Sequence, residues 1–173
     1  MRVEWEREYV DYATAGMERL KRLAYTLCGD VHSASDLVQS TLVRLYERWP
    51  RVRGVEHVDA YVQKMLLRQF LMEQRRPWSR IRLSGHLPET AAPARTDDER
   101  PILVAALRRL PPRQRAVLVL RFLYDLPIGE VAALLGCGEG TVKSQSSRGL
   151  ATMRGLLDEP VAARTTLGSS HGH

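Results

Sequence analysis

The chain of 173 residues has only two cysteines, two phenylalanines and three lysines, and it has no long apolar run. Cys28 and Cys137 lie far apart, without a CxxC pair or a nearby histidine cluster. We therefore expect structural thiols in a reducing cytoplasm rather than a zinc site. No apolar run approaches the length that spans a bilayer, and the first residues, MRVEWEREYV, lack the apolar segment of a signal peptide. The expected location is cytoplasmic.

The sequence also lacks the patterns that carry most enzyme chemistry. It has no glycine-rich phosphate loop followed by Lys-Ser or Lys-Thr, no histidine pair at metal-ligand spacing and no nucleophile elbow. The histidines are scattered at His32, His57 and His86, with His171 and His173 close to the C-terminus. We predict no catalytic residue, no metal site and no cofactor, and hence a protein that is not an enzyme.

Positive charge is concentrated in one part of the chain. The formal net charge is +6, and residues 44–82 contain ten basic and four acidic residues, which accounts for the whole excess. This distribution predicts a surface that binds a polyanion, and a solvated basic face is the alternative. The scarcity of lysine among the 26 basic residues favours planar guanidinium groups on phosphates and bases, or reflects a GC-rich genome.

Hydrophobic periodicity predicts an all-α chain with two small helical domains. In residues 1–80 we expect one helix from about Tyr9 up to Gly29, a second closed by Pro50 and a third from about Asp59 to Gln74. Residues 81–99 lack periodicity and predict a flexible linker. Residues 100–158 predict four helices, including one from Arg113 to Tyr124 and a last one that ends near Leu157. Residues 159–173 are small, polar and aperiodic, which predicts a disordered tail.

The segment from Pro127 to Arg148 has the spacing of a helix-turn-helix. A helix is expected over Ile128–Leu135, and Gly136 supplies the positive φ of a sharp turn. Ala132 is small enough for a close helix crossing, and Val142 falls where the second helix packs inward. The second helix of this motif enters the DNA major groove, so the pattern predicts DNA binding. An ordinary αα-hairpin is the alternative.

Polar residues of the second helix share one face. From Glu139 onward, helical spacing places Thr141, Ser144, Gln145 and Arg148 on that face, with Lys143 and Ser147 flanking it. Arg and Gln side chains can reach base edges, whereas Thr and Ser can reach phosphates. Gly138 at the N-cap leaves the helix N-terminus open to a phosphate.

The basic segment combines arginines with aromatic residues. Trp49, Tyr61 and Trp78 are interspersed with Arg51, Arg53, Arg68, Arg75 and Arg76. Cations follow a nucleic-acid backbone and aromatic rings stack on unpaired bases, although a core role is favoured for Tyr61 and Trp49. The basic loop from Arg51 to His57, which contains Gly54, is a candidate site for an extruded base.

Several motifs in collinear order resemble bacterial sigma factors. Asp36-Leu-Val-Gln39, Leu42-Val-Arg-Leu-Tyr-Glu-Arg-Trp49 and Ala60-Tyr-Val-Gln-Lys-Met-Leu66 before Arg75-Arg76 resemble the polymerase-binding and promoter-melting domain. Leu110-Pro-Pro-Arg-Gln-Arg115, Glu130-Val-Ala-Ala-Leu-Leu-Gly136 and Gly140-Thr-Val-Lys-Ser-Gln145 resemble the second sigma domain. With these two domains alone, over about residues 5–157, the chain is similar to the extracytoplasmic-function (ECF) group, and Gly140–Arg148 to its SigE-like actinobacterial subgroup.

The resemblance implies a set of partners and roles. Asp36, Gln39 and Arg44 would contact core RNA polymerase at the β′ clamp helices, and the β flap is a further expected contact. Arg51, Arg53, Gly54, His57, Arg68, Arg75 and Arg76 would bind the −10 element, and the 51–57 loop would capture a flipped base. The helix from Glu139 would read the −35 element of promoter DNA, with Arg113 and Arg115 on phosphates. An anti-sigma factor is a further partner that the resemblance allows.

The chain departs from the family pattern at three positions. Arg68 stands where Asn is frequent, Met72 stands where Asp is frequent and Ser40 stands where an acid is common. Two other functions fit parts of the sequence. A stand-alone helix-turn-helix regulator would leave the pattern of residues 36–76 unexplained, and an all-α protein-interaction module would bind DNA independently of salt or not at all.

Overall fold

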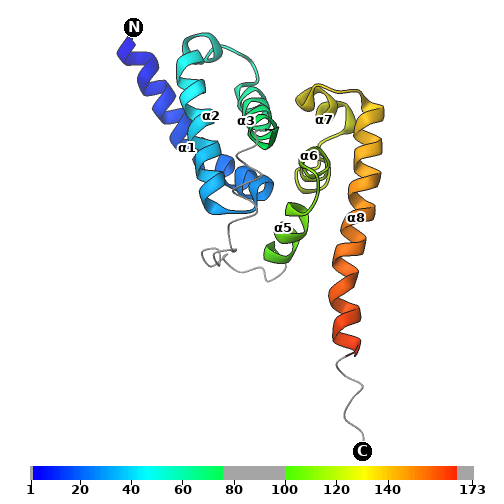
Figure 1. Ribbon diagram of the computed structural model, residues 1–173. Coiled ribbons are helices and arrows are strands. Elements are labelled where there is room, and N and C mark those ends of the chain that lie inside the picture. Colours follow the sequence, from blue (N-terminus) through cyan, green and yellow to red (C-terminus); the bar gives the residue numbers. More distant parts are fainter. Residues whose placement is uncertain (1, 76–99, 167–173) are drawn as a thin grey trace, which may run out of the picture.

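The computed structural model describes residues 2–75 and 100–166, and these residues form helices joined by short turns, with no strand among them (Figure 1). An N-terminal domain contains α1 (Arg2–Cys28), α2 (Val31–Val52) and α3 (Val58–Arg75). A C-terminal domain contains α5 (Arg100–Arg108), α6 (Pro112–Leu118), the π-helix η1 (Val119–Leu123), α7 (Ile128–Leu135) and α8 (Glu139–Thr166). The predicted all-α class with a four-helix second domain is confirmed. No helix in these two ranges is long and apolar enough to cross a membrane.

The N-terminal domain is an antiparallel packing of α1 and α2 with α3 across them. The turn between α1 and α2 is tight, because Gly29 adopts φ +80° and the Asp30 side chain accepts a hydrogen bond from the N–H of Ser33 at 2.8 Å. The apolar faces bury Leu27, Leu37, Leu45, Leu66 and Phe70 to 1% exposure or less.

The second helix is longer than the sequence predicted. We expected Pro50 to close it, but α2 continues through Pro50 to Val52. A proline in the last turn of a helix removes only one backbone donor, and Val52 is buried at 4% exposure, so its packing compensates for that lost bond. The N–H of Arg53 then donates to the carbonyl of Trp49 at 2.9 Å and ends the helix.

The helix predicted from Arg113 to Tyr124 changes its winding halfway. After α6 the chain passes into η1, where the N–H of Tyr124 donates to the carbonyl of Val119, five residues earlier, at 3.1 Å. The wider turn shifts the following side chains around the axis. Phe122 is 48% exposed, whereas Val119 and Leu120 are buried.

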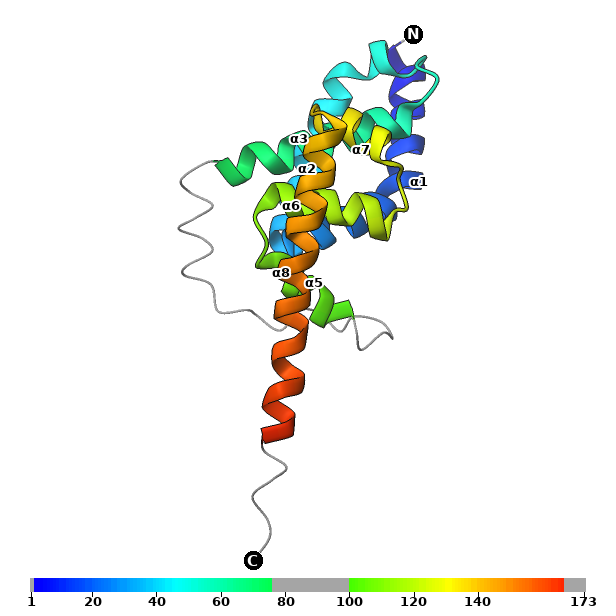
Figure 2. The same cartoon turned by 90° about the vertical axis from the view of Figure 1, so that its right-hand side faces the viewer.

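The last helix also differs from the prediction. Helix α8 continues through Pro160 to Thr166, rather than ending near Leu157 with a disordered segment from residue 159. Figure 2 shows α8 crossing the front of the C-terminal domain and extending beyond it. The expected linker over residues 81–99 lies outside the described residues, as do Arg76, Trp78 and the end of the expected tail.

Candidate nucleic-acid and protein interfaces

The helix-turn-helix has the geometry that its spacing predicts. Helix α7 spans Ile128–Leu135, and Gly136 follows it with φ +66°. The N–H of Cys137 donates to the carbonyl of Ala132 at 3.0 Å, and the N–H of Val142 donates to the carbonyl of Gly138 at 3.2 Å. Val142 is fully buried, so it fixes the start of α8 against the domain core.

A glycine that the sequence reading missed sets how closely α8 approaches the domain. A Cβ added at Gly149 would lie 2.9 Å from the Cδ1 and 3.0 Å from the Cγ of Leu118 in α6. Leu118 is itself buried, so it has little room to move aside. A glycine within a helix lowers helix propensity, and here the close crossing of two helices explains its presence.

The predicted DNA-reading residues lie on the accessible side of α8. Thr141, Lys143, Ser144, Ser147 and Arg148 are exposed, and Gln145 is half-buried. The Ser144 hydroxyl donates to the carbonyl of Gly140 at 2.9 Å, so its hydrogen is already used within the helix. The Arg148 guanidinium has no hydrogen bond or ion pair in the described structure, which leaves all its donors for a ligand.

The two arginines expected on phosphates have different surroundings. Arg113 is exposed, whereas Arg115 is buried at 5% exposure. The Arg115 guanidinium donates to the carbonyls of Leu27 at 2.6 Å, Arg108 at 3.0 Å and Leu110 at 2.9 Å. A contact between Arg115 and a phosphate would therefore require the guanidinium to leave these carbonyls, and that contact stays a prediction.

Burial also changes the acid–base chemistry around Arg115. Desolvation, with a smaller contribution from nearby Arg108, lowers the pKa of Arg115 to about 10, so the guanidinium stays charged near neutral pH. Burial, assisted by the charges of Asp30 and Glu73, raises the pKa of the Cys28 thiol to about 12. Such a thiol stays protonated and unreactive, as expected of a structural cysteine.

The basic loop after α2 presents most of its predicted residues to solvent. Arg51, Gly54 and His57 are exposed, and the N–H of Val55 donates to the carbonyl of Val52 at 2.9 Å. Arg53 is exposed too, but its Nε lies 3.3 Å from a carboxylate oxygen of Glu8 in α1. One arginine of this loop, Arg53, therefore already has an anionic partner, which the sequence did not predict.

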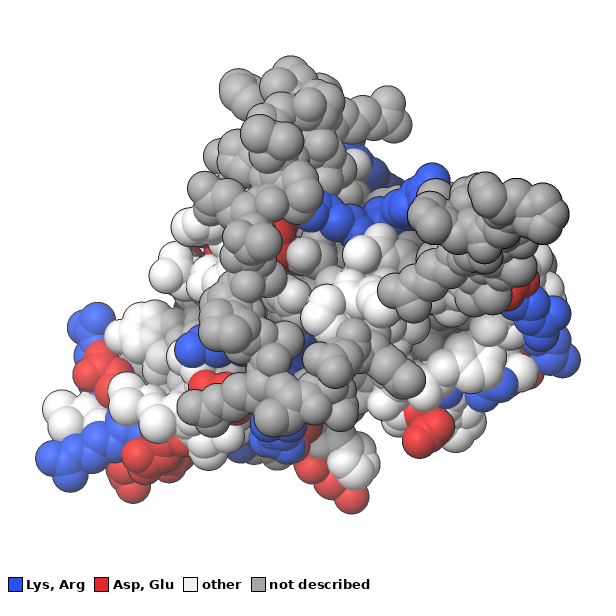
Figure 3. All heavy atoms as spheres, turned by 90° about the horizontal axis from the view of Figure 1, so that it is seen from below, with Lys and Arg blue, Asp and Glu red and all other residues white. Residues whose placement is uncertain are grey.

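Helix α3 places two further predicted arginines on the same domain. Arg68 and Arg75 are exposed, and the neighbouring Met72 is 45% exposed. Figure 3 shows basic and acidic side chains side by side on the face seen from below, so on this face the charge is mixed.

The aromatic residues near the basic loop mostly pack between helices. Trp49 is 4% exposed and its ring contacts Tyr9 and Tyr12 at centroid distances of 5.7 and 5.2 Å. The core role favoured for Trp49 is confirmed. Tyr61 is half-buried, and Arg48 donates to its hydroxyl at 3.5 Å. Trp49 is therefore not available to stack on an extruded base.

Helix α2 carries an exposed face that no other helix among the described residues covers. Asp36, Gln39 and Arg44 are all exposed. Helical spacing places Val43 on the same side as Asp36 and Gln39, and Val43 is 60% exposed. An exposed valine between polar residues is a candidate apolar contact for a protein partner, and the sequence reading did not include it.

No group of three or more metal-ligating side chains occurs among the residues that the structure describes. The exposed surfaces on α2, α3, α8 and the 51–57 loop are instead suited to binding macromolecules through arginine, polar and apolar contacts.

Comparison with known proteins identifies both halves of the chain. Residues 14–80 match the family described as sigma-70 region 2, and residues 100–153 match the one described as sigma-70, region 4. The RNA polymerase sigma-E factor of Streptomyces avermitilis is 36% identical over 158 residues, which cover 87% of this chain and 86% of the relative. The sigma-E factor of Streptomyces coelicolor is 34% identical over 154 residues, covering 85% and 84%.

A solved structure has a similar fold. The sigma factor RpoE of Bartonella quintana, solved in complex with the anti-sigma factor NepR, superposes with a TM-score of 0.69. The match covers 88% of this chain and 98% of that chain at 24% identity, so this likeness concerns the fold.

Proposed function

The chain belongs to the sigma-70 family of RNA polymerase sigma factors, in its ECF group. We propose which of its surfaces bind core polymerase and which bind each promoter element. As a sigma factor it binds core RNA polymerase and directs initiation at specific promoters. We assign polymerase binding and opening of the −10 element to residues 1–80, and recognition of the −35 element to residues 100–158.

The observation that carries the −35 assignment is the orientation of α8. Val142 is buried while Thr141, Lys143 and Arg148 are exposed, so the first turns of α8 present polar side chains outward. Arg148 is the best candidate for a bidentate contact with a guanine, because its guanidinium has no competing partner in residues 2–75 and 100–166. Thr141, Ser144, Ser147 and Lys143 would bind phosphates or base edges beside it, and Gln145 is a second candidate for base contact.

We assign binding of the −10 element to the loop after α2 and to α3. Arg51, His57, Arg68 and Arg75 are exposed on the N-terminal domain and would follow the phosphates of a separated strand. Extruding a base costs a few kcal/mol, and contacts in the 51–57 loop would offset that cost. Arg53 would exchange Glu8 for a phosphate when DNA arrives. Arg76 belongs to the same assignment by its sequence position.

We assign the binding of core polymerase to the exposed face of α2. Asp36 and Gln39 supply charge and hydrogen bonds, Arg44 lies nearby, and Val43 adds an exposed apolar side chain. We propose the β′ clamp helices as the element that docks there and the β flap as a contact of the C-terminal domain. An anti-sigma factor is also a proposed partner.

The proposed mode of action is binding without covalent chemistry, and it takes place where polymerase and promoter DNA are, in the cytoplasm. Run-off transcription tests it directly. Core polymerase with this protein should give a discrete transcript from a promoter that has both elements, and core alone should give none. Scrambling the −35 sequence should lower the yield, and scrambling the −10 sequence should abolish it. A protein that shifts promoter DNA but leaves core polymerase inactive would instead be a stand-alone regulator.

A further inference from the structure

The loop that follows α2 is held at its ends rather than along its length. Residues 53–57 are all exposed, and a Cβ added at Gly54 would meet nothing within 4 Å beyond its chain neighbours. The N–H of Tyr61 donates to the carbonyl of His57 at 3.2 Å, so the last residue of the loop is already tied to the start of α3. Because the loop buries no side chain of its own, its position depends on what holds the residues on either side of it.

One residue of α1 contacts both of these flanks. The ring centroid of Tyr12 lies 5.2 Å from that of Trp49, in the last turn of α2 before the loop. The Tyr12 hydroxyl donates to Oδ1 of Asp59, in the first turn of α3 after the loop, at 2.7 Å. The loop joins α2 to α3 at the end of the domain where α1 begins (Figure 1). Tyr12 therefore bridges the two sides of the loop.

The hydroxyl contact is the one that fixes Asp59. A hydrogen bond from a hydroxyl to a carboxylate is charge-assisted and about twice as strong as a neutral one. Burial, together with the hydrogen bond to Asp59, raises the pKa of Tyr12, so the hydroxyl keeps its proton near neutral pH. A nitrogen of Arg19 lies 3.6 Å from the same carboxylate oxygen, but both side chains are largely exposed and water screens this ion pair.

The other contact between α1 and the loop is of a different kind. Glu8, one turn before Tyr12, lies 3.3 Å from the Nε of Arg53. A phosphate competes with Glu8 for that guanidinium, so this ion pair breaks when Arg53 binds DNA. The bond between Tyr12 and Asp59 contains no cation that a phosphate would attract, and it persists when the strand binds. Helix α1 thus gives the loop one contact that is exchanged and one that lasts.

We propose that Tyr12 is a positioning residue for capture of the extruded −10 base. By bridging Trp49 and Asp59 it fixes how far apart the ends of the loop lie, so the loop is ordered before the base arrives. Without the hydroxyl, the loop would be ordered only on binding, and the lost conformational freedom would lower the affinity for the base. The inference rests on the proposed function, and it adds a residue that lies outside the basic segment.

Tyr12→Phe tests the proposal, and Tyr9→Phe is its matched control. Both substitutions keep a ring in contact with Trp49, since the Tyr9 ring lies 5.7 Å from it. The Tyr9 hydroxyl also makes a 2.7 Å hydrogen bond, but its acceptor is the carbonyl of Leu42 within α2. If the hydroxyls only stabilise the domain, the two variants should behave alike.

The measurement uses holoenzyme assembled from the full chain and core polymerase. The DNA is a fork whose −10 segment is single-stranded, with an abasic site placed at each −10 position in turn. The position at which the unmodified protein loses most affinity marks the captured base, and the readout is the ratio of affinities for the intact and the abasic strand. Tyr12→Phe should lower this ratio about three- to tenfold by weakening binding of the intact strand alone. Tyr9→Phe should keep the ratio, and both variants should bind core polymerase normally.

Asp59→Ala approaches the same contact from the other side and changes an exposed side chain. It removes the acceptor, so it should lower the ratio by a similar factor. The double variant with Tyr12→Phe should lower it no further, because the two residues act through one bond. Additive losses would overturn the proposal, and so would an equal loss of affinity for intact and abasic strands in Tyr12→Phe.

The positioning role and the proposed function can fail separately. If the unmodified holoenzyme binds every abasic strand as well as the intact one, the loop captures no base, and its assignment falls together with this inference. If the unmodified protein shows the loss at one position and Tyr12→Phe keeps the same ratio, only the positioning role is wrong.

Discussion

Replacing Arg148 with alanine should selectively weaken recognition of the −35 element. Arg148 is exposed on α8, and no contact within the described structure has to break before it binds DNA. Its full contribution should therefore appear in the binding equilibrium. A good bidentate contact with a base discriminates by about 1–3 kcal/mol, which corresponds to an affinity loss of about 5- to 150-fold.

The assay compares two DNA duplexes at fixed salt, one with the preferred −35 sequence and one with that sequence scrambled. Arg148→Ala should lower affinity for the preferred duplex by that factor and leave the scrambled duplex almost unchanged. Arg154→Ala is the matched control, because it removes the same charge from an exposed position about 120° around the same helix. An equal loss on both duplexes would make Arg148 a phosphate contact, and no loss on either would refute the reasoning.

Three further predictions concern other surfaces. Asp36→Ala should weaken binding to core polymerase in a pull-down or titration, whereas Asp11→Ala, which removes an exposed carboxylate of α1, should not; equal affinity for both variants would contradict the assignment of α2. Gly149→Ala should be less stable than Gly155→Ala by about 1–3 kcal/mol in urea unfolding, because only the first introduces a Cβ against buried Leu118; similar midpoints would show that α6 and α8 can separate at little cost. At pH 9 an alkylating reagent should modify Cys137 well before Cys28, because burial raises the pKa of Cys28 to about 12; mass spectrometry showing equal modification would contradict the burial of that thiol.

The sequence was sufficient for the helices whose signals are local. Gly136, Ala132 and Val142 predicted the helix-turn-helix, and the structure has α7 over Ile128–Leu135 as expected. Those residues act through backbone conformation and short-range packing, which spacing in a single sequence can express.

Predictions based on proline were less reliable, because tertiary packing can outweigh one lost hydrogen bond. Pro50 lies inside α2 since Val52 beyond it is buried, and α8 continues through Pro160. The π-helix at Val119–Leu123 has no signal in the apolar pattern, so the exposure of Phe122 could not be foreseen.

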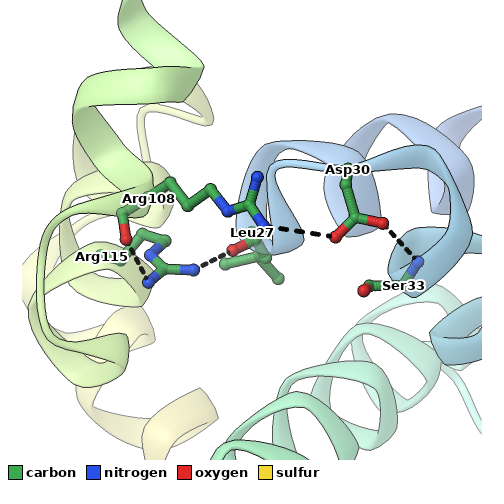
Figure 4. Close-up of polar contacts among 5 residues, drawn as sticks. All are labelled: Leu27, Asp30, Ser33, Arg108 and Arg115. Carbon is green, nitrogen blue, oxygen red and sulfur yellow. Dashed lines mark hydrogen bonds and ion pairs between the residues drawn. The ribbon is translucent and has the colours of Figure 1, made fainter. Parts of the chain in front are cut away.

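Arg115 shows how far the candidate site could be predicted from the sequence. In sequence it is one of several arginines near a DNA-binding motif, and nothing local distinguishes it from exposed Arg113. Its guanidinium donates to the carbonyls of Arg108 and Leu110 nearby in sequence and also to the carbonyl of Leu27, a residue 88 positions away (Figure 4). Contacts between domains of this kind depend on the tertiary arrangement, and a local pattern does not contain them.

The ion pair between Arg53 and Glu8 has a consequence for how promoter binding responds to salt. An arginine that binds a phosphate releases counterions from the DNA, and each such contact steepens the fall of affinity with salt concentration. When Arg53 leaves Glu8, the freed carboxylate gathers cations of its own, and this uptake offsets part of the release. The slope of log affinity against log salt concentration should then indicate fewer phosphate contacts than the arginines actually make. Glu8→Gln should make this slope steeper without adding any contact to the DNA.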